Sequence, residues 1–206
     1  TNKTKKLKDN LLIGRERRVA TLLTTAANYD AALTATLSGS SQWDNGSYTG
    51  DIIKEIDAMA EAVRLACGVR PNTIIIGAAV VPTLTNHSSF RDHYKYTAND
   101  IAGNGLPPTL RGMRVLVPGA QYTSSNEGAA STTIADVWGK NVICAFIEPG
   151  ATEDSFCLAK TFRAQDWQTR KYDVDEQRAE YVETNAIEDV KMVSNIAGYL
   201  KKAVVS

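Results

Sequence analysis

The side chains best suited to nucleophilic or metal chemistry in this 206-residue sequence are three cysteines and two histidines. Cys67, Cys144 and Cys157 include no CxxC pair, and the sequence identifies neither a general base nor an electropositive setting for any of them. We therefore expect small buried side chains in a reducing compartment. His87 and His93 lie six residues apart and do not share one helical face, so neither zinc binding nor a histidine-dependent triad is predicted.

Acidic and glycine-rich stretches also lack the patterns of known sites. Asp173, Asp175 and Glu176 form the densest acidic group, but no calcium-loop glycine or terminal glutamate follows, so we interpret them as a solvated strand edge. Gly103 and Gly105 run into Leu106-Pro107-Pro108 rather than a third glycine and a helix, and no GxxxxGK(S/T) motif occurs. The sequence therefore predicts no catalytic, cofactor-binding or metal-binding residues, and no cofactor.

The charge balance narrows the choice of partners. Lysine plus arginine and aspartate plus glutamate each total 23, so the formal net charge is zero. This balance disfavours a globally basic nucleic-acid binder and a protein drawn to anionic membranes by its overall charge. The longest apolar run, Ile74–Val81, has eight residues, against the roughly 20 of a membrane-crossing helix. We expect a soluble globular protein with no membrane partner.

A long helix must position the most basic stretch of the chain. Lys5–Ala27 repeats apolar residues near helical spacing and carries Arg15, Arg17 and Arg18 on a polar face. These arginines either bind an acidic partner or form a solvated, ion-paired surface.

A loop and a second helix follow. The Gly/Ser-rich stretch Leu37–Gly50 predicts a loop. Trp43 within it is expected to be buried, either against its own domain or against a neighbouring subunit. The next helix has an apolar stripe at i, i+4 and i+7, with Thr49 or Asp51 as its N-cap and Gly68 at its C-terminal end.

Short strands, short helices and loops make up the rest of the sequence. Pro82 begins one short helix, and a second carries Phe90 and Tyr94. The polar connector Pro118–Thr133 is long enough to be a mobile or binding loop. Residues 137–147, with a Gly-Lys-Asn turn, resemble a hairpin. The expected strands are Thr73–Ile76, Met113–Val117, the alternating stretches 156–162 and 178–193, and Ala197–Val205.

Several of these segments, in this order, resemble the major capsid proteins of tailed double-stranded DNA phages, which have the Hong Kong ninety-seven fold. The matching segments are Gln42-Trp43-Asp44 before the helix Ile52–Val63, the strand Pro71–Gly77 (PNTIIIG), Asp92–Tyr96, Val137–Lys140 (VWGK), Ala145–Ile147, Arg170–Asp175 and Ile196–Leu200. The order of the motifs, rather than any single one, carries the resemblance.

The resemblance implies an α+β capsid fold with a spine helix, a peripheral β-sheet and an axial α/β domain. It places residues 1–70 and 160–195 in the peripheral part and residues 71–159 and 196–206 in the axial domain. It also implies that this chain lacks the family's N-terminal arm and extended loop. The helix with the three arginines corresponds to the spine helix, and Pro118–Thr133 to an axial loop.

Six residues are candidate assembly contacts on this basis. They are Arg15, Arg17, Arg18, Trp43, Asn126 and Glu127. We expect Arg17→Glu combined with Arg18→Glu to weaken assembly while leaving the monomer folded.

The function implied by the resemblance is structural rather than enzymatic. Such a protein self-assembles as hexamers and pentamers into the icosahedral head shell of a tailed phage or prophage, within the host cytoplasm, and becomes part of the virion. Scaffold, protease and portal proteins are the implied partners, with nonspecific contact to packaged DNA. Zero net charge suits close packing of many copies.

Three alternatives are weighed against the phage shell. A bacterial encapsulin-like compartment shell has the same fold. A small cytosolic hydrolase or transferase would use Cys144 or Cys157. A nucleic-acid-binding module is the third, although the sequence lacks an aromatic-plus-basic pattern.

Overall fold

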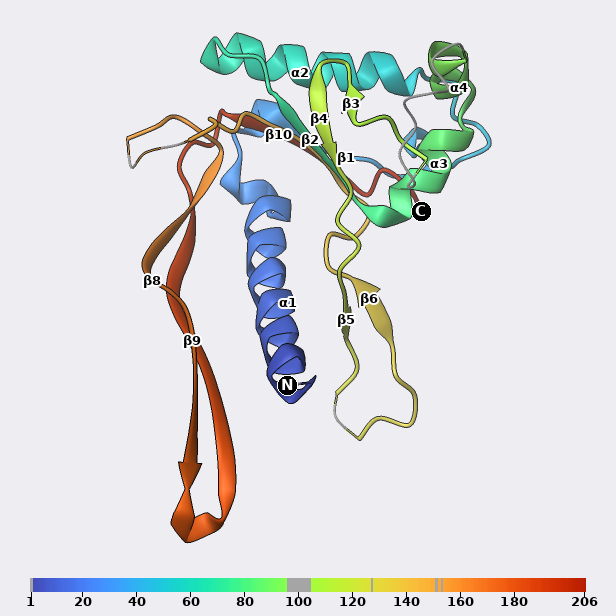
Figure 1. The fold of residues 1–206 in the computed structure, drawn as a ribbon. Helices are drawn as coiled ribbons and strands as arrows, with labels where there is room; N and C mark the ends of the chain where they lie inside the picture. The colour runs from blue at the N-terminus through green and yellow to red at the C-terminus, as the bar shows by residue number, and fades with distance from the viewer. Residues whose placement is uncertain (1, 96–104, 127, 151, 153) are drawn as a thin grey trace.

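The computed structural model describes residues 2–95, 105–126, 128–150, 152 and 154–206. The α-helices of this described part are α1 (Asn2–Thr24), α2 (Ile52–Cys67), α3 (Val81–Asn86) and α4 (Ser88–Tyr94). Its strands are β1 (Thr34–Thr36), β2 (Thr73–Ile76), β3 (Thr109–Leu110), β4 (Met113–Leu116), β5 (Gln121–Thr123), β6 (Ile134–Asp136), β7 (Val142–Ala145), β8 (Ala159–Val174), β9 (Ala179–Met192) and β10 (Gly198–Lys202). Figure 1 shows a sheet body from which α1 and two hairpins extend in the same direction.

The central sheet has six strands in the order β1-β10-β7-β2-β4-β3. β1 is parallel to β10 and β2 is parallel to β4, whereas β7 runs antiparallel to both of its neighbours, β10 and β2. All residues of β2 and β7 are buried, as expected for apolar strands covered on both faces. The predicted hairpin at residues 137–147 is therefore wrong. β7 pairs with strands distant in sequence, and the preceding strand, β6, pairs with β5.

α2 covers one face of this sheet (Figure 1). Of the two candidate N-caps, Asp51 takes the role: its carboxylate accepts from the N–H of Ile53 at 3.0 Å and of Lys54 at 3.3 Å. The helix ends at Gly68, whose φ of 77° is left-handed. Its buried stripe consists of Ile52, Ile53, Ile56, Met59, Ala60 and Val63. The predicted helix and its C-terminal glycine are confirmed.

α1 packs against the sheet body through its C-terminal half. Ala20 and Leu23 are buried in a core shared with the sheet. The Trp138 Nε1–H donates to Glu16 Oε1 at 2.8 Å. The helix ends at Thr24 rather than at the predicted Ala27, because a 3-10 turn over Ala26–Asn28 follows.

β8 and β9 form a two-stranded ribbon that runs beside α1 and beyond its start (Figure 1). The pairing extends from Ala159–Met192 to Val174–Ala179, with irregularities between 163 and 165 and between 165 and 168. At the base of the ribbon, Met192 packs against the core that contains Ala20 and Leu23. An isolated ribbon of this kind is marginally stable, so its contacts with α1 matter. The acidic residues 173, 175 and 176 lie exposed at or beside its turn, as the sequence predicts.

The connector Pro118–Thr133 is not a loop throughout. Its residues Gln121–Thr123 form β5, which pairs antiparallel with β6. The Gln121 Nε2–H donates to Asp136 Oδ1 at 2.8 Å, which closes the base of this second hairpin. The predicted loop is therefore shorter than expected and is carried at the end of a hairpin that points the same way as α1 (Figure 1).

The packing also bears on the expected division of the chain. Residues 34–67, which the resemblance assigned to the peripheral part, contribute β1 and α2 to the sheet body.

Within the described residues, no helix has both the length and the apolar character that crossing a bilayer requires. Tyr96, Gly103 and Glu127, named in the sequence analysis, lie outside the described residues.

Candidate assembly interface

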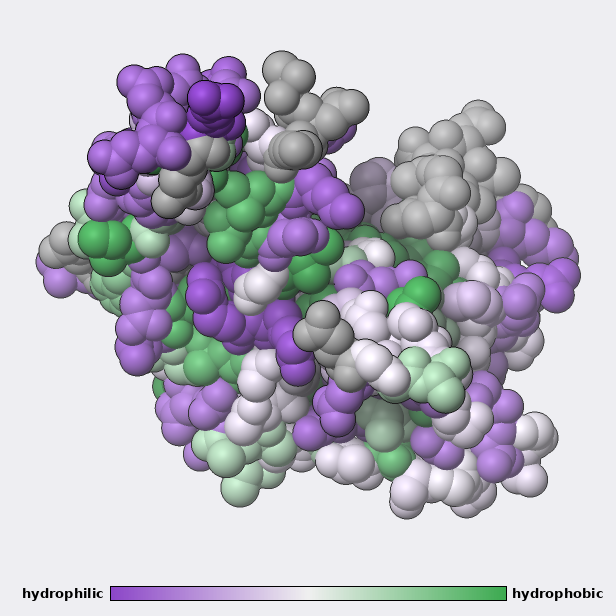
Figure 2. Space-filling model, turned by 90° about the horizontal axis from the view of Figure 1, so that it is seen from below, coloured by the Kyte–Doolittle hydropathy of each residue, from purple (hydrophilic) through white to green (hydrophobic). Residues whose placement is uncertain are grey.

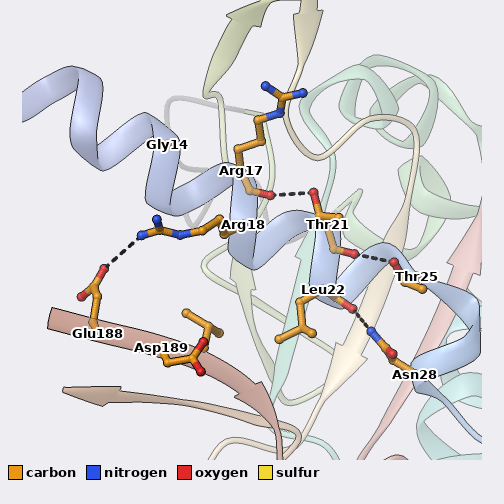
Figure 3. Close-up of a pocket in the computed structure, with 10 residues that line it drawn as sticks. Gly14, Arg17, Arg18, Thr21, Leu22, Thr25, Asn28, Glu188 and Asp189 are labelled. Carbon is orange, nitrogen blue, oxygen red and sulfur yellow. Dashed lines mark hydrogen bonds and ion pairs between the residues drawn. The ribbon is translucent and has the colours of Figure 1, made fainter. Parts of the chain in front are cut away.

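The three arginines of interest lie on α1 but face two different neighbours. Arg15 and Arg18 are three residues apart and share one side of the helix, whereas Arg17 is turned away from them. In Figure 3, Arg18 is directed at Glu188 of β9 and Arg17 points away from it. Arg17 and Arg18 help to line an open groove of about 610 Å³ between α1 and β9.

Glu188 is the centre of a charged cluster at this groove. Its side chain is only 4% exposed, and its Oε1 lies 3.0 Å from Arg15 Nε and 3.8 Å from Arg18 Nη2. The Arg15 Nε–H and Glu188 Oε1 are not aligned as a hydrogen bond, so their attraction is Coulombic. A buried carboxylate is costly unless paired. The surrounding guanidinium groups offset that cost and hold β9 against α1.

A third arginine, Arg163 of β8, extends this cluster into the ribbon. Its Nη2 lies 3.5 Å from Glu188 Oε2, and its Nη1 lies 2.8 Å from Asp166 Oδ1. Residues 163 and 166 flank the first irregularity in the pairing of β8 with β9. One guanidinium therefore links the irregular part of the ribbon to the contact with α1. We call Arg15, Arg18, Arg163, Asp166 and Glu188 the helix–ribbon junction.

Arg17 connects α1 to the second hairpin. Its guanidinium carbon lies 4.4 Å from the centre of the Tyr122 ring on β5. A cation–π contact at an exposed position contributes about 0.5–1 kcal/mol. The arginines of α1 thus hold two hairpins, one on each side of the helix.

Trp43 is buried within its own chain. The residue is 2% exposed and packs in the core beneath α2 with Val204 and Val205. Its Nε1–H donates to Glu55 Oε2 at 3.0 Å, and the same carboxylate accepts from Tyr48 Oη at 2.7 Å and Lys201 Nζ at 2.6 Å. Of the two alternatives for Trp43, the structure shows packing against its own domain.

Asn126 lies exposed in the loop between β5 and β6, where its carbonyl accepts from the Ala129 N–H at 3.2 Å. Glu127, the candidate next to it in the sequence, is outside the described residues. None of the described contacts joins Asn126 to the arginines of α1 or to Trp43. The five candidates that the structure describes therefore do not form one site.

Sequence reasoning missed Glu188, Arg163 and Tyr122. Glu188 and Tyr122 contact the arginines of α1, and Arg163 contacts Glu188. A signal for Glu188 was present. Val182, Val190 and Met192 alternate on one side of β9, and Glu188 occupies an apolar position of that alternation. A charged residue at a position where the alternation calls for an apolar side chain indicates a buried ion pair.

The surroundings of the cysteines and of His87 explain their roles in the fold. Burial raises the pKa of the Cys144 thiol to about 12 and raises that of Cys157, so both are poor nucleophiles near neutral pH. Cys67, expected to be buried, is only partly so. The His87 ring accepts from the Ser89 N–H at the start of α4. No group of three or more metal-ligating side chains occurs among the residues that the structure describes.

Comparison with known proteins gives the family. The model of a family described as phage major capsid protein E matches residues 19–186. The major capsid protein of Burkholderia phage BcepMu is 26% identical over 133 residues, which are 65% of this chain and 41% of that protein.

Solved structures give the fold. A phage-related protein from Bordetella bronchiseptica superposes with a TM-score of 0.82 at 18% identity, over 97% of this chain and 66% of that one. The mature capsid of bacteriophage PhiM1 superposes with a TM-score of 0.50 at 16% identity, over 89% of this chain and 59% of that one. The chain thus spans about two fifths of the curated relative and at most about two thirds of these solved chains.

The expected α+β fold of the Hong Kong ninety-seven type is confirmed by these superpositions. The family match covers most of the chain, from the C-terminal half of α1 to β9. The chain belongs to the phage major capsid protein E family.

Proposed function

We propose that this protein is a structural subunit of a tailed-phage or prophage head, without catalytic activity, that assembles with copies of itself into an icosahedral shell. The observation that carries the proposal is the family match over residues 19–186. The fold supports it, because it superposes along 97% of the chain on a phage-related protein.

The axial and peripheral parts of the subunit are assigned from the way its elements pack. The sheet body with α2 forms the axial part, and α1 with the β8–β9 ribbon forms the peripheral part. The proposal moves residues 34–67 from the peripheral to the axial part, and the packing of β1 and α2 in the sheet body supports this. The helix–ribbon junction then sets the angle between the ribbon and α1. In a shell, this angle determines which neighbours the ribbon reaches.

The partners of this subunit are first of all its own copies, as hexamers and pentamers. Scaffold, protease and portal proteins act with it during assembly in the host cytoplasm, and packaged DNA touches the inner face without sequence recognition. The compartment-shell alternative shares the fold, but the matching family is one of phage capsid proteins. Neighbouring genes for a portal and a terminase, rather than for a cargo enzyme, separate the two uses.

The direct test is electron microscopy of the full-length gene product, combined with sedimentation over a range of concentrations. Closed shells, or rings of five and six subunits, are the expected result. A protein that stays monomeric at high concentration contradicts the proposal.

A further inference from the structure

One face of the ribbon carries large apolar side chains that stay partly exposed in the described chain. Strand register places Phe162, Tyr172, Tyr181 and Ile187 on one side of the ribbon, opposite the side of Glu188. These side chains are 40–58% exposed. Because a two-stranded ribbon is marginal on its own, this side needs a second surface.

The outer half of α1 has the same property. Leu11, Leu12 and Ile13 are 36–38% exposed although all three are large and apolar. Lys5, Lys6 and Lys8, one to two turns before them, are exposed. None of these three lysines has an ion pair within the described residues. Figure 2, seen from the end to which α1 and the ribbon point, shows hydrophobic residues scattered among hydrophilic ones rather than covered by them.

The two surfaces have opposite charge. Asp173, Asp175 and Glu176 are exposed at the turn of the ribbon, and none of them has an ion pair in the described chain. Neighbouring charges of the ribbon are already paired, as in Arg170–Glu183 at 2.7 Å. Among the described residues, the acidic turn and the lysines of α1 therefore each lack an ion-pair partner, and the helix–ribbon junction holds α1 beside the ribbon.

We propose that the start of α1 of one copy docks against the outer half of the ribbon of the next copy, with Lys5, Lys6 and Lys8 facing Asp173, Asp175 and Glu176. The exposed aliphatic side chains of α1 then cover Tyr172 and Tyr181, which pair with each other in the outer half of the ribbon. The contact joins two different surfaces and is heterologous, the type that closes rings of identical subunits. This inference rests on the proposed shell function and names the surfaces that serve it.

A second copy fits these surfaces better than nucleic acid does. A phosphate backbone would pair with the lysines, but it would leave Leu11, Leu12 and Ile13 uncovered. It would also meet repulsion from the acidic turn, which lies at the same end of the molecule (Figure 1). A neighbouring copy supplies both an apolar surface and the opposite charge.

A charge exchange tests the contact in the full-length protein. One variant carries Lys5→Glu, Lys6→Glu and Lys8→Glu, a second carries Asp173→Lys, Asp175→Lys and Glu176→Lys, and a third combines all six changes. The matched control is Lys54→Glu on α2, whose side chain is 84% exposed. We expect each triple variant to lower the assembled fraction about tenfold or more, because exposed attractive pairs become repulsive. The combined variant should recover assembly.

Mixing the two triple variants gives a second measurement. It does not require the variant with all six substitutions to fold. Every contact in an alternating ring of six is again complementary, so sedimentation should show rings of six that neither variant forms alone. Triple variants that assemble like the wild type overturn the inference, as does failure of both the combined variant and the mixture.

Two further outcomes are informative. Loss of binding to a short DNA duplex by the lysine variant, with assembly unchanged, assigns the lysines to nucleic acid and overturns the inference. If the wild type and Lys54→Glu themselves do not assemble, the shell function fails and this inference fails with it. If they do assemble, a negative result concerns the contact alone.

Discussion

Arg15 of α1 and Glu188 of β9 lie 3.0 Å apart, from Nε to Oε1, at the point where the ribbon meets the helix. The Glu188 side chain is 4% exposed and that of Arg15 is 29% exposed, so the pair is largely removed from water. Neither atom has a well-aligned hydrogen bond, although each is buried. The pair therefore holds α1 and β9 together by charge attraction.

Removing the carboxylate tests this attraction. Glu188→Ala should lower the free energy of unfolding by about 2–3 kcal/mol, between the values for exposed and for fully buried pairs, because it leaves the Arg15 charge uncompensated. Amide exchange should accelerate along β8 and β9 more than in β2. Urea unfolding and hydrogen exchange measure the two effects. The control is Glu183→Gln. Glu183 lies on β9, like Glu188, and its ion pair with Arg170 of β8 is more exposed. An equal response of both variants contradicts a special role for Glu188.

Reversing Arg17 and Arg18 separates folding from assembly. Arg17→Glu removes the contact with Tyr122, and Arg18→Glu places a negative charge beside Glu188. Because the Arg18 side chain is 67% exposed, we expect a folded monomer that is about 1 kcal/mol less stable. Both hairpins lose a contact with α1, so particle formation should fall. Circular dichroism, urea unfolding and electron microscopy of the double variant give the readout, and normal particles would refute the expectation.

Glu55 makes stability depend on pH. Burial raises its pKa, but hydrogen bonds from Lys201, Tyr48 and Trp43 outweigh burial and bring the pKa below the ordinary 4.5. The folded state therefore binds fewer protons than the unfolded state. The stabilisation from Glu55 is complete above the unfolded pKa and declines as the pH falls toward the folded pKa.

Glu55→Gln should remove this dependence. Near neutral pH we expect a loss of about 1–3 kcal/mol, because three donors lose a charged acceptor. Below the folded pKa of Glu55 the difference from wild type should shrink. Urea unfolding at about pH 7 and about pH 3 measures it, with Glu176→Gln at the exposed turn as the control. A Glu55→Gln deficit of the same size at both pH values contradicts the assignment.

The predictable parts of this fold are those with local signals. α2 was predicted because its cap, its apolar spacing and Gly68 all lie within one stretch of sequence. Burial of Trp43 followed from the size of the ring, but the charged group around it did not, because Lys201, which shares the Glu55 carboxylate with Trp43, is 146 residues from Glu55. Residue type alone does not identify a partner at such a distance.

Strand pairing failed for the same reason. The turn residues before β7 suggested a local hairpin, yet the apolar residues of β7 suit any buried neighbour and pair with β2 and β10. The arginines of α1 were identified as a charged face, whereas Glu188 and Tyr122 come from hairpins that reach α1 only in the folded chain. Periodicity places residues on faces of elements, and tertiary packing decides which faces meet.

Gly77 shows where two motifs of the sequence meet and allows a sharp test of packing. A Cβ built at Gly77 would lie 2.1 Å from the carbonyl oxygen of Gly139, and this oxygen is backbone and cannot turn aside. The Gly77 N–H also donates to the Asn141 carbonyl at 2.9 Å, which fixes the approach. Gly77→Ala should therefore cost about 3 kcal/mol by overpacking. Gly119→Ala, where a Cβ has no neighbour within 4 Å, should change stability little. Urea unfolding of the two variants decides the matter, since equal midpoints would mean that the junction of β2 with the turn before β7 yields to a methyl group.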